Sequence, residues 1–116
     1  MSDEIIDLKE VLERVQDDKE LLNELFDIYQ EDFVVKRQAL GNAIAAQDIA
    51  KIKEVAHSMK GASGNISAKL LYAACLQLEK LAKEGKTDGM QEVAVSIDRY
   101  FEEIKIFAAR FKKELG

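Results

Sequence analysis

Residues 48–67 read DIAKIKEVAHSMKGASGNIS, and this stretch indicates the fold class. Its apolar and small residues recur three and four positions apart, which is the spacing of one face of an α-helix. They are Ile49, Ile52, Ala56, Met59, Ser63 and Ile66. Asp48 stands directly before this stripe, where a helix N-cap is expected. The stretch therefore predicts an amphipathic helix that is capped by Asp48 and breaks at residues 65–67.

The same spacing continues on both sides of this helix. The chain contains no Pro, and no useful length of it alternates with period two. A short helix is expected over residues 8–15, and a long second helix follows it and ends near Gln47. Two more helices are expected after the break at residues 65–67, and the first of them, the fourth helix of the chain, ends at Gly85. The expected caps are Asp7 with Glu10, Asp17 with Glu20, Asp48, Ser67 and Thr87. We therefore predict an all-α fold, an antiparallel four-helix bundle (up-down-up-down) with a short N-terminal accessory helix.

Length and composition exclude several classes of protein. The 116 residues predict one domain over 1–116, and the net charge of −5 offers no field for a nucleic acid. The chain has no run of the roughly 20 apolar residues that a membrane span needs. Acidic residues at Asp3 and Glu4 replace the basic start of a signal peptide, so a cytoplasmic location is expected. One Cys and one His cannot build a usual zinc site, so we expect no bound metal, and Cys75 is expected to be a small buried residue.

The single histidine is the most informative residue. A lone His on a helix is usually a hydrogen-bonded core or rim residue, but at 100° per residue His57 lies roughly 130° from the centre of the apolar stripe. It is therefore expected to point outward. Lys53, Lys60, Gly61 and Gly64 share its direction, which makes the strip both small and basic.

The two glycines and the two lysines suggest a use for that strip. Each Gly in the middle of a helix lowers helix stability by about 1 kcal/mol relative to Ala, so the presence of two needs an explanation. One explanation is that they clear space beside His57 for a partner. Gly64 also fits the end of a helix, whereas Gly61 does not. Lys60 lies at i+3, within reach of a group attached to the imidazole. Lys53 fits an ordinary solvated lysine better than Lys60 does.

An exposed imidazole beside a cation suits phosphoryl transfer. A neutral ring nitrogen is the nucleophile, and we expect it to be Nε2, while Lys60 offsets phosphate charge. The sequence shows neither a magnesium-binding acidic cluster nor a Gly-rich nucleotide loop. No cofactor is expected on this chain, and Mg²⁺ and the catalytic machinery are expected to come from the partner.

The run AHSMKGASGNISA, residues 56–68, resembles the signature of histidine-containing phosphotransfer (HPt) domains. The resemblance joins His57, Lys60 and Gly61 at fixed spacing, extends to Leu71, Cys75, Leu78 and Glu79, and centres on residues 48–85. It implies a four-helix bundle whose His accepts a phosphoryl group from a receiver-domain aspartate and passes it to another receiver. The chain is then a phosphocarrier, not an enzyme, with receiver domains and a hybrid sensor kinase as partners, and it is expected to be a monomer.

Two further positions in the resembling region are Ser67 and Glu79. The family usually has Gly where this chain has Ser67, which is expected to alter only the turn after the third helix. Glu79 aligns with a position that can lie beside the phosphohistidine, and antiparallel helices would bring it level with His57. The favoured interpretation of Glu79 is nevertheless plain solvation on the helix surface.

Other classes fit less well. A sensor kinase dimerisation domain typically has an acidic residue after the His and a nearby Pro, but this chain has Ser58 and no Pro. The His domain of a chemotaxis kinase shares the His-x-x-Lys-Gly core and differs over residues 62–68. A bundle hydrolase needs a second catalytic group, and a purely structural bundle would not need both His57 and Lys60. Whether the domain stands alone or belongs to a hybrid kinase, and which receivers it serves, stay open.

Overall fold

A computed structural model describes residues 4–115, and its regular structure consists of five helices. They are α1 (Leu8–Arg14), α2 (Lys19–Ala45), α3 (Ile49–Asn65), α4 (Lys69–Lys83) and α5 (Met90–Leu115). The described residues contain no strand. Within this range no helix is long and apolar enough to cross a membrane.

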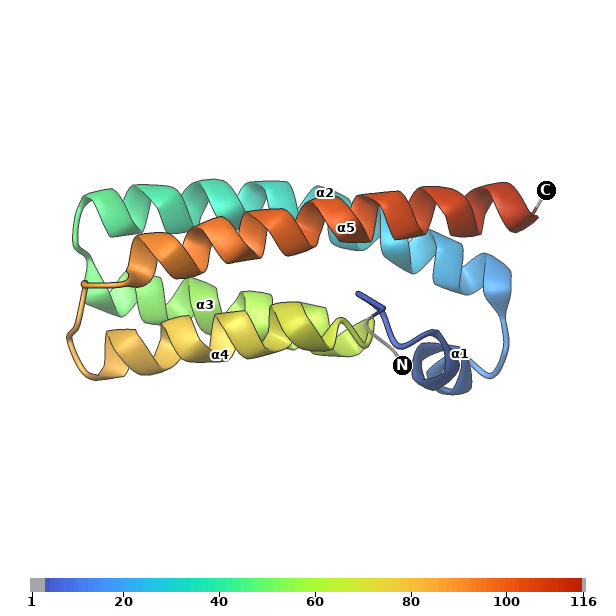
Figure 1. The fold of residues 1–116 in the computed structure, drawn as a ribbon, viewed down its shortest axis with the longest axis horizontal. Helices are drawn as coiled ribbons and strands as arrows, with labels where there is room; N and C mark the ends of the chain where they lie inside the picture. The colour runs from blue at the N-terminus through green and yellow to red at the C-terminus, as the bar shows by residue number, and fades with distance from the viewer. Residues whose placement is uncertain (1–3, 116) are drawn as a thin grey trace.

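The four long helices form two layers. In Figure 1, α2 and α5 run side by side above α3 and α4. Each helix of one layer packs on a helix of the other, α2 on α3 and α5 on α4, and each layer is itself a packed pair. The short helix α1 lies across one end of the bundle, beneath the part of α2 and α5 that extends past α3 and α4 (Figure 1). The predicted antiparallel four-helix bundle with an N-terminal accessory helix is confirmed.

The predicted stripes form the core. On α5, the apolar residues spaced three and four positions apart are buried, namely Met90, Val93, Ile97, Phe101, Ile104, Ala108 and Phe111. On α3 the stripe is buried from Ile52 onward, and Ile49 at its start is half-buried. Cys75 is fully buried, as expected, and burial raises the pKa of its thiol to about 12. Periodicity alone therefore located the buried face of each long helix.

Two predicted caps are confirmed and one is shifted by a residue. The carboxylates of Asp7 and Asp48 accept hydrogen bonds from the backbone N–H three residues ahead, at 3.1 Å each. The prediction of Asp17 as the cap of α2 was wrong, since Asp18 accepts from Leu21 N–H at 3.0 Å. Asp17 instead has φ 62° and forms the turn before the helix.

Ser67 was wrongly predicted as the cap of α4. Ala68 occupies that position, without a side-chain hydrogen bond, and Ser67 has φ 58°, in the left-handed region that favours glycine. Its backbone carbonyl accepts from Asp7 N–H at 3.0 Å, and its hydroxyl donates to Glu10 Oε1 at 2.7 Å. The capping-box prediction required the Glu10 side chain to accept from the N–H of Asp7. Glu10 instead binds the turn between α3 and α4. Ser67 thus fastens α1 to the bundle.

The start of the last helix also differs from the prediction. Thr87 was expected to cap it, but α5 begins three residues later, at Met90. The chain first turns at Gly89, with φ 89°, and the backbone carbonyl of Thr87 accepts from Met90 N–H. Gly85 has φ 70° just after α4, as predicted for a residue that ends a helix.

Candidate functional site

His57 projects from the middle of α3 into solvent. Its side chain is 68% exposed, which confirms the outward direction predicted from the helical wheel. Its Nδ1 lies 3.0 Å from Oε2 of Glu79, which is 22 residues later on α4. The two helices run antiparallel and pack closely, so these positions lie at the same level of the bundle.

Glu79 is a buried carboxylate with both oxygens engaged. Its side chain is only 7% exposed, and its Oε1 accepts a 2.8 Å hydrogen bond from Lys60 Nζ. The expectation of a solvated Glu79 was therefore wrong, because the side chain turns toward α3 and not into solvent. The Lys60 ammonium, helped by the hydrogen bond from His57, lowers the pKa of Glu79, and Glu79 in turn raises the pKa of Lys60.

This arrangement selects one tautomer of the imidazole. An ionised carboxylate can only accept hydrogen bonds, so the ring nitrogen facing Glu79 must carry the proton. A neutral His57 then has its proton on Nδ1 and a free lone pair on Nε2. The nucleophilic nitrogen expected from the sequence is thus the one that the Glu79 contact leaves available.

The two glycines of the strip have different surroundings. A methyl group added at Gly61 would meet nothing within 4 Å, so this flank of α3 is bare. A methyl group at Gly64 would lie 3.3 Å from Cδ2 of Tyr72 on α4. Gly61 therefore fits the predicted role of clearing space for a partner. Gly64 lies against α4, one residue before the end of α3, which agrees with its alternative role at the end of a helix. Gly64 makes room for the Tyr72 ring.

Behind the site, α3 is fixed to α2 by a buried polar contact. The Ser63 hydroxyl lies 3.2 Å from Tyr29 Oη and donates to the carbonyl of Met59 at 2.8 Å. Neither side chain is left without a partner, so the contact holds the helix that carries His57 at a defined rotation.

Comparison with known proteins agrees with this geometry. The family model described as Hpt domain matches residues 10–107. This chain belongs to the Hpt domain family. Its structure is similar to the crystal structure of histidine-containing phosphotransfer protein B (HptB) from Pseudomonas aeruginosa PAO1, with a TM-score of 0.85 and 29% sequence identity over 97% of this chain and 96% of that one. A search of curated protein sequences gives no match.

Hpt domains carry out histidine phosphotransfer in phosphorelays and interact with receiver domains and kinases. In this Hpt domain, no hydrogen bond or ion pair among the described residues joins Lys53 to the group formed by His57, Lys60 and Glu79. Lys53 lines an open hollow beside His57, together with Ala50, Glu54, Glu79 and Lys83. Within residues 4–115 there is no cluster of three His, Cys, Asp or Glu side chains that could hold a metal ion.

The sequence reasoning missed two residues of α4 that border the site, Tyr72 and Lys83. One signal could have found them, because Tyr72, Glu79 and Lys83 lie seven and four residues apart and so share one side of a helix. Once Glu79 is known to face His57, that side of α4 must border the imidazole.

Proposed function

We propose that His57 accepts a phosphoryl group from the aspartyl phosphate of one receiver domain and passes it to another receiver. The observation that carries the proposal is the exposed imidazole whose Nδ1 is held by the buried carboxylate of Glu79. The chain acts as a phosphocarrier without an ATP site or a metal of its own, and Mg²⁺ belongs to the partner receiver. A hybrid sensor kinase is a further partner in this proposal.

The chemical step follows from the contacts of the ring. The lone pair of Nε2 attacks the phosphorus in line with the bond to the aspartate oxygen. The Nε2–P bond forms, the P–O bond breaks, and its electron pair leaves on the aspartate carboxylate. The phosphorylated ring carries positive charge and keeps its Nδ1 proton, which the Glu79 carboxylate stabilises. Transfer to the next receiver reverses these changes.

Lys60 stabilises the charge of the phosphoryl group in this mechanism. An ammonium group has three N–H donors, and Glu79 takes one of them. The pair with Glu79 holds the ammonium on the side of α3 that carries His57, and the other donors can meet phosphate oxygens. Lys60 is therefore positioned before the phosphoryl group arrives, which avoids reorganisation during the reaction.

The remaining sequence expectations belong to the same proposal. Residues 1–116 act as one Hpt domain, with the motif in residues 48–85, as a monomer in the cytoplasm.

The test is a transfer assay with radiolabelled receiver domains of the same organism, each charged with acetyl phosphate and Mg²⁺. We expect at least one receiver to pass its label to this protein as an acid-labile, base-stable phosphate, and His57→Gln to receive none while its helical circular dichroism is unchanged. A second, uncharged receiver should then take the label. Labelling of His57→Gln at the wild-type rate, or retention of all label on every receiver, would show that the proposal is wrong.

A further inference from the structure

The contact between His57 and Glu79 also bears on how long a phosphoryl group stays on the ring. A phosphorylated imidazole has two protonation states, which differ in the proton on Nδ1. When Nδ1 carries a proton, breaking the Nε2–P bond releases a neutral imidazole. When Nδ1 has lost that proton, the same step must release an imidazolate anion, which is a much poorer leaving group. The group that faces Nδ1 therefore controls the reactivity of the phosphorylated ring.

Glu79 faces Nδ1 as an ionised and buried carboxylate. Its Oε2 lies 3.0 Å from Nδ1, and because its side chain is buried, water screens the contact poorly. The Lys60 ammonium donates to Oε1 at 2.8 Å and lowers the pKa of Glu79, so the carboxylate is ionised at neutral pH. A charge of opposite sign within about 4–6 Å shifts the titration of a group by roughly one to three pH units in favour of its charged form. Glu79 therefore favours the proton on Nδ1 of a phosphorylated ring.

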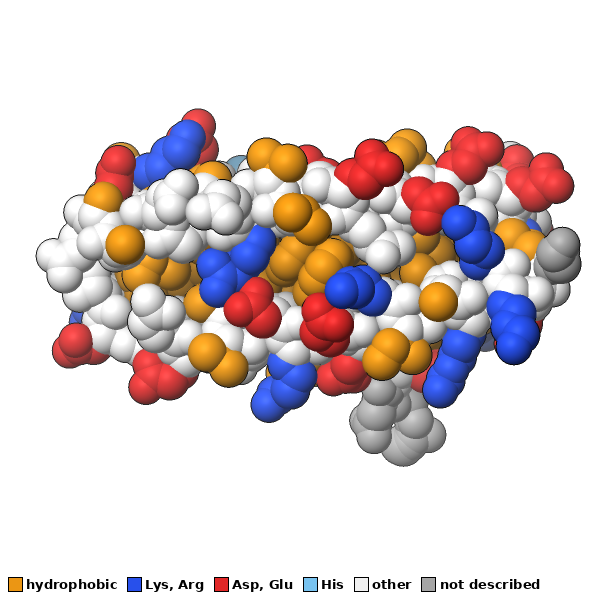
Figure 2. All heavy atoms as spheres, turned by 90° about the horizontal axis from the view of Figure 1, so that it is seen from above, with side chains coloured by type: hydrophobic (Ala, Val, Ile, Leu, Met, Phe, Trp, Pro, Cys, Tyr) orange, Lys and Arg blue, Asp and Glu red, His pale blue; other side chains and the backbone are white. Residues whose placement is uncertain are grey.

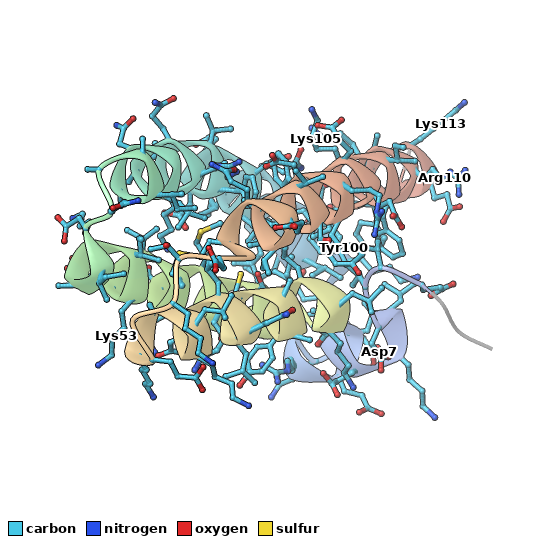
Figure 3. All side chains as sticks on the ribbon, turned by 60° about the vertical axis from the view of Figure 1, so that its left-hand side comes forward. Asp7, Lys53, Tyr100, Lys105, Arg110 and Lys113 are labelled. Carbon is cyan, nitrogen blue, oxygen red and sulfur yellow. The ribbon has the colours of Figure 1, made fainter. Side chains whose placement is uncertain are left out.

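The other charged groups beside the ring come from α3 and α4, the two helices that border it. They are Lys53, Glu54 and Lys60 on α3 and Lys83 on α4. The charge of Lys60 is balanced by its pair with Glu79. The other three side chains are exposed and line the open hollow, where water screens them, and Figure 3 shows Lys53 at the edge formed by α3 and the end of α4. Within residues 4–115, no charged side chain other than Glu79 is hydrogen-bonded to the ring.

We propose that Glu79 keeps phosphorylated His57 protonated on Nδ1 through neutral and mildly alkaline pH, which makes the phosphorylated protein a short-lived donor at these pH values. The inference rests on the proposed function, because it concerns the phosphorylated form of His57. Glu79 is a positioning residue in it, since the carboxylate acts on the ring proton and the phosphoryl group is bonded to the other nitrogen. The chain then relays a phosphoryl group and does not store it.

The loss of the phosphoryl group to water illustrates the role of the proton. The water oxygen bonds to phosphorus, the Nε2–P bond breaks, and its electron pair returns to Nε2. A ring that is protonated on Nδ1 becomes a neutral imidazole in this step, and the products are that imidazole and dihydrogen phosphate. A ring without the proton must take one from solvent as the bond breaks. Donation to a receiver aspartate breaks the same bond, so both rates should follow the protonated fraction of the ring.

Glu54 provides a matched control for Glu79. Both glutamates line the same hollow beside His57. The side chain of Glu54 is 70% exposed and pairs with Lys51 at 3.4 Å, and no hydrogen bond among the described residues joins it to the ring. Glu54→Gln and Glu79→Gln therefore remove the same charge from the same hollow, and only Glu79→Gln removes the charge that contacts Nδ1.

The experiment measures hydrolysis of the phosphorylated protein without any receiver. Wild type and the two variants are labelled on His57 with phosphoramidate, a small phosphodonor, and the loss of label is followed over a pH range of about 5 to 9. We expect the rate to fall with rising pH, with a midpoint at least about one pH unit lower in Glu79→Gln than in wild type. At about pH 8.5 that variant should then lose its label about tenfold more slowly. Glu54→Gln should keep the wild-type midpoint. Equal midpoints in wild type and Glu79→Gln, or equal shifts in both variants, would overturn the inference.

The wild-type protein provides a second test, which does not depend on how a variant folds. Nitrogen NMR of the phosphorylated protein reports the proton on Nδ1 directly. We expect Nδ1 to keep its proton to at least about one pH unit above 6.5, where an ordinary histidine loses it. Loss of the proton near 6.5 would overturn the inference and leave the proposed function intact. If neither phosphoramidate nor any receiver labels wild-type His57, the proposed function is wrong and the inference falls with it.

Discussion

The two layers of the bundle differ in the side chains that they contain and in what those side chains do. All five phenylalanines of the chain lie on α2 and α5. Phe26 meets Phe107 and Phe111 edge to face, at centroid distances of 6.0 and 5.5 Å, and Phe33 stacks on Phe101 at 3.8 Å. The face of this layer shows hydrophobic atoms between the two helices, flanked by charged groups (Figure 2). Aromatic burial therefore stabilises the α2–α5 layer.

The α3–α4 layer has no phenylalanine and instead has small residues and a polar group. Gly61 and Gly64 lower its helix propensity, and the buried carboxylate of Glu79 needs two partners. Both features cost stability. Gly61 leaves the flank of α3 beside His57 bare, and Glu79 contacts the imidazole. The contrast indicates that the aromatic layer offsets the cost of the functional layer, so that stability and phosphotransfer can be changed separately.

Removing an aromatic ring from the first layer should have the largest effect on stability. Phe26 is fully buried, and Phe26→Ala is expected to lower the free energy of unfolding by about 3–5 kcal/mol. Urea titration followed by circular dichroism measures this loss. Under conditions where the variant is folded, its rate of transfer to His57 should match the wild type. A slower rate in the folded variant would contradict the separation of the two layers.

Removing the charge of Glu79 should affect mainly transfer. Glu79→Gln leaves Lys60 without its carboxylate and no longer selects the Nδ1 tautomer, so we expect transfer to slow by about tenfold or more. Quenched-flow measurement of the labelled protein checks this, and nitrogen NMR should show the Nδ1–H fraction of neutral His57 falling. An unchanged tautomer ratio would show that Glu79 has only a structural role.

The same variant has a defined pH signature. The pKa of Glu79 in the folded protein lies below its ordinary value of 4.5, so its ionised form stabilises the fold above that value. This contribution is lost as the pH falls from 4.5 through the folded pKa. Wild type should therefore lose stability more steeply than Glu79→Gln on acidification below pH 4.5.

Filling the bare flank of α3 should have a small effect on stability, of the opposite sign to that of Phe26→Ala. Gly61→Ala adds a methyl group that meets nothing, so the gain in helix propensity should raise the free energy of unfolding by up to about 1 kcal/mol. Transfer from a receiver should slow, because the methyl group occupies the space beside His57 that Gly61 leaves for a partner. Labelling of His57 by phosphoramidate, a small phosphodonor that needs no docking, should not change.

Gly64→Ala is the matched comparison for Gly61→Ala. Its methyl group lies 3.3 Å from the Tyr72 ring, which must move by a few tenths of an ångström, so the gain in stability should be smaller. Thermal melts of the two variants measure this difference. A larger gain for Gly64→Ala would contradict the close packing of α3 on α4 at this position.

The amino-acid sequence was sufficient for the helices, their buried faces and the outward direction of His57. These properties depend on residues three and four positions apart, so they can be read from a local pattern. The same pattern failed at Asp17 and Ser67, where backbone φ is positive and the turn is set by contacts beyond the helix.

Only the tertiary structure decided what lies beside the imidazole. Glu79 has the charge of a surface residue, and its burial depends on Lys60 and His57, which are 19 and 22 residues away on another helix. Gly64 and Tyr72 likewise meet only because α3 and α4 pack closely. The sequence by itself thus determined the outward direction of His57, the proposed phosphoryl carrier, because a helix presents its side chains by local geometry. The partners that orient this residue were decided by the packing of two helices, which brings together residues that no local spacing connects.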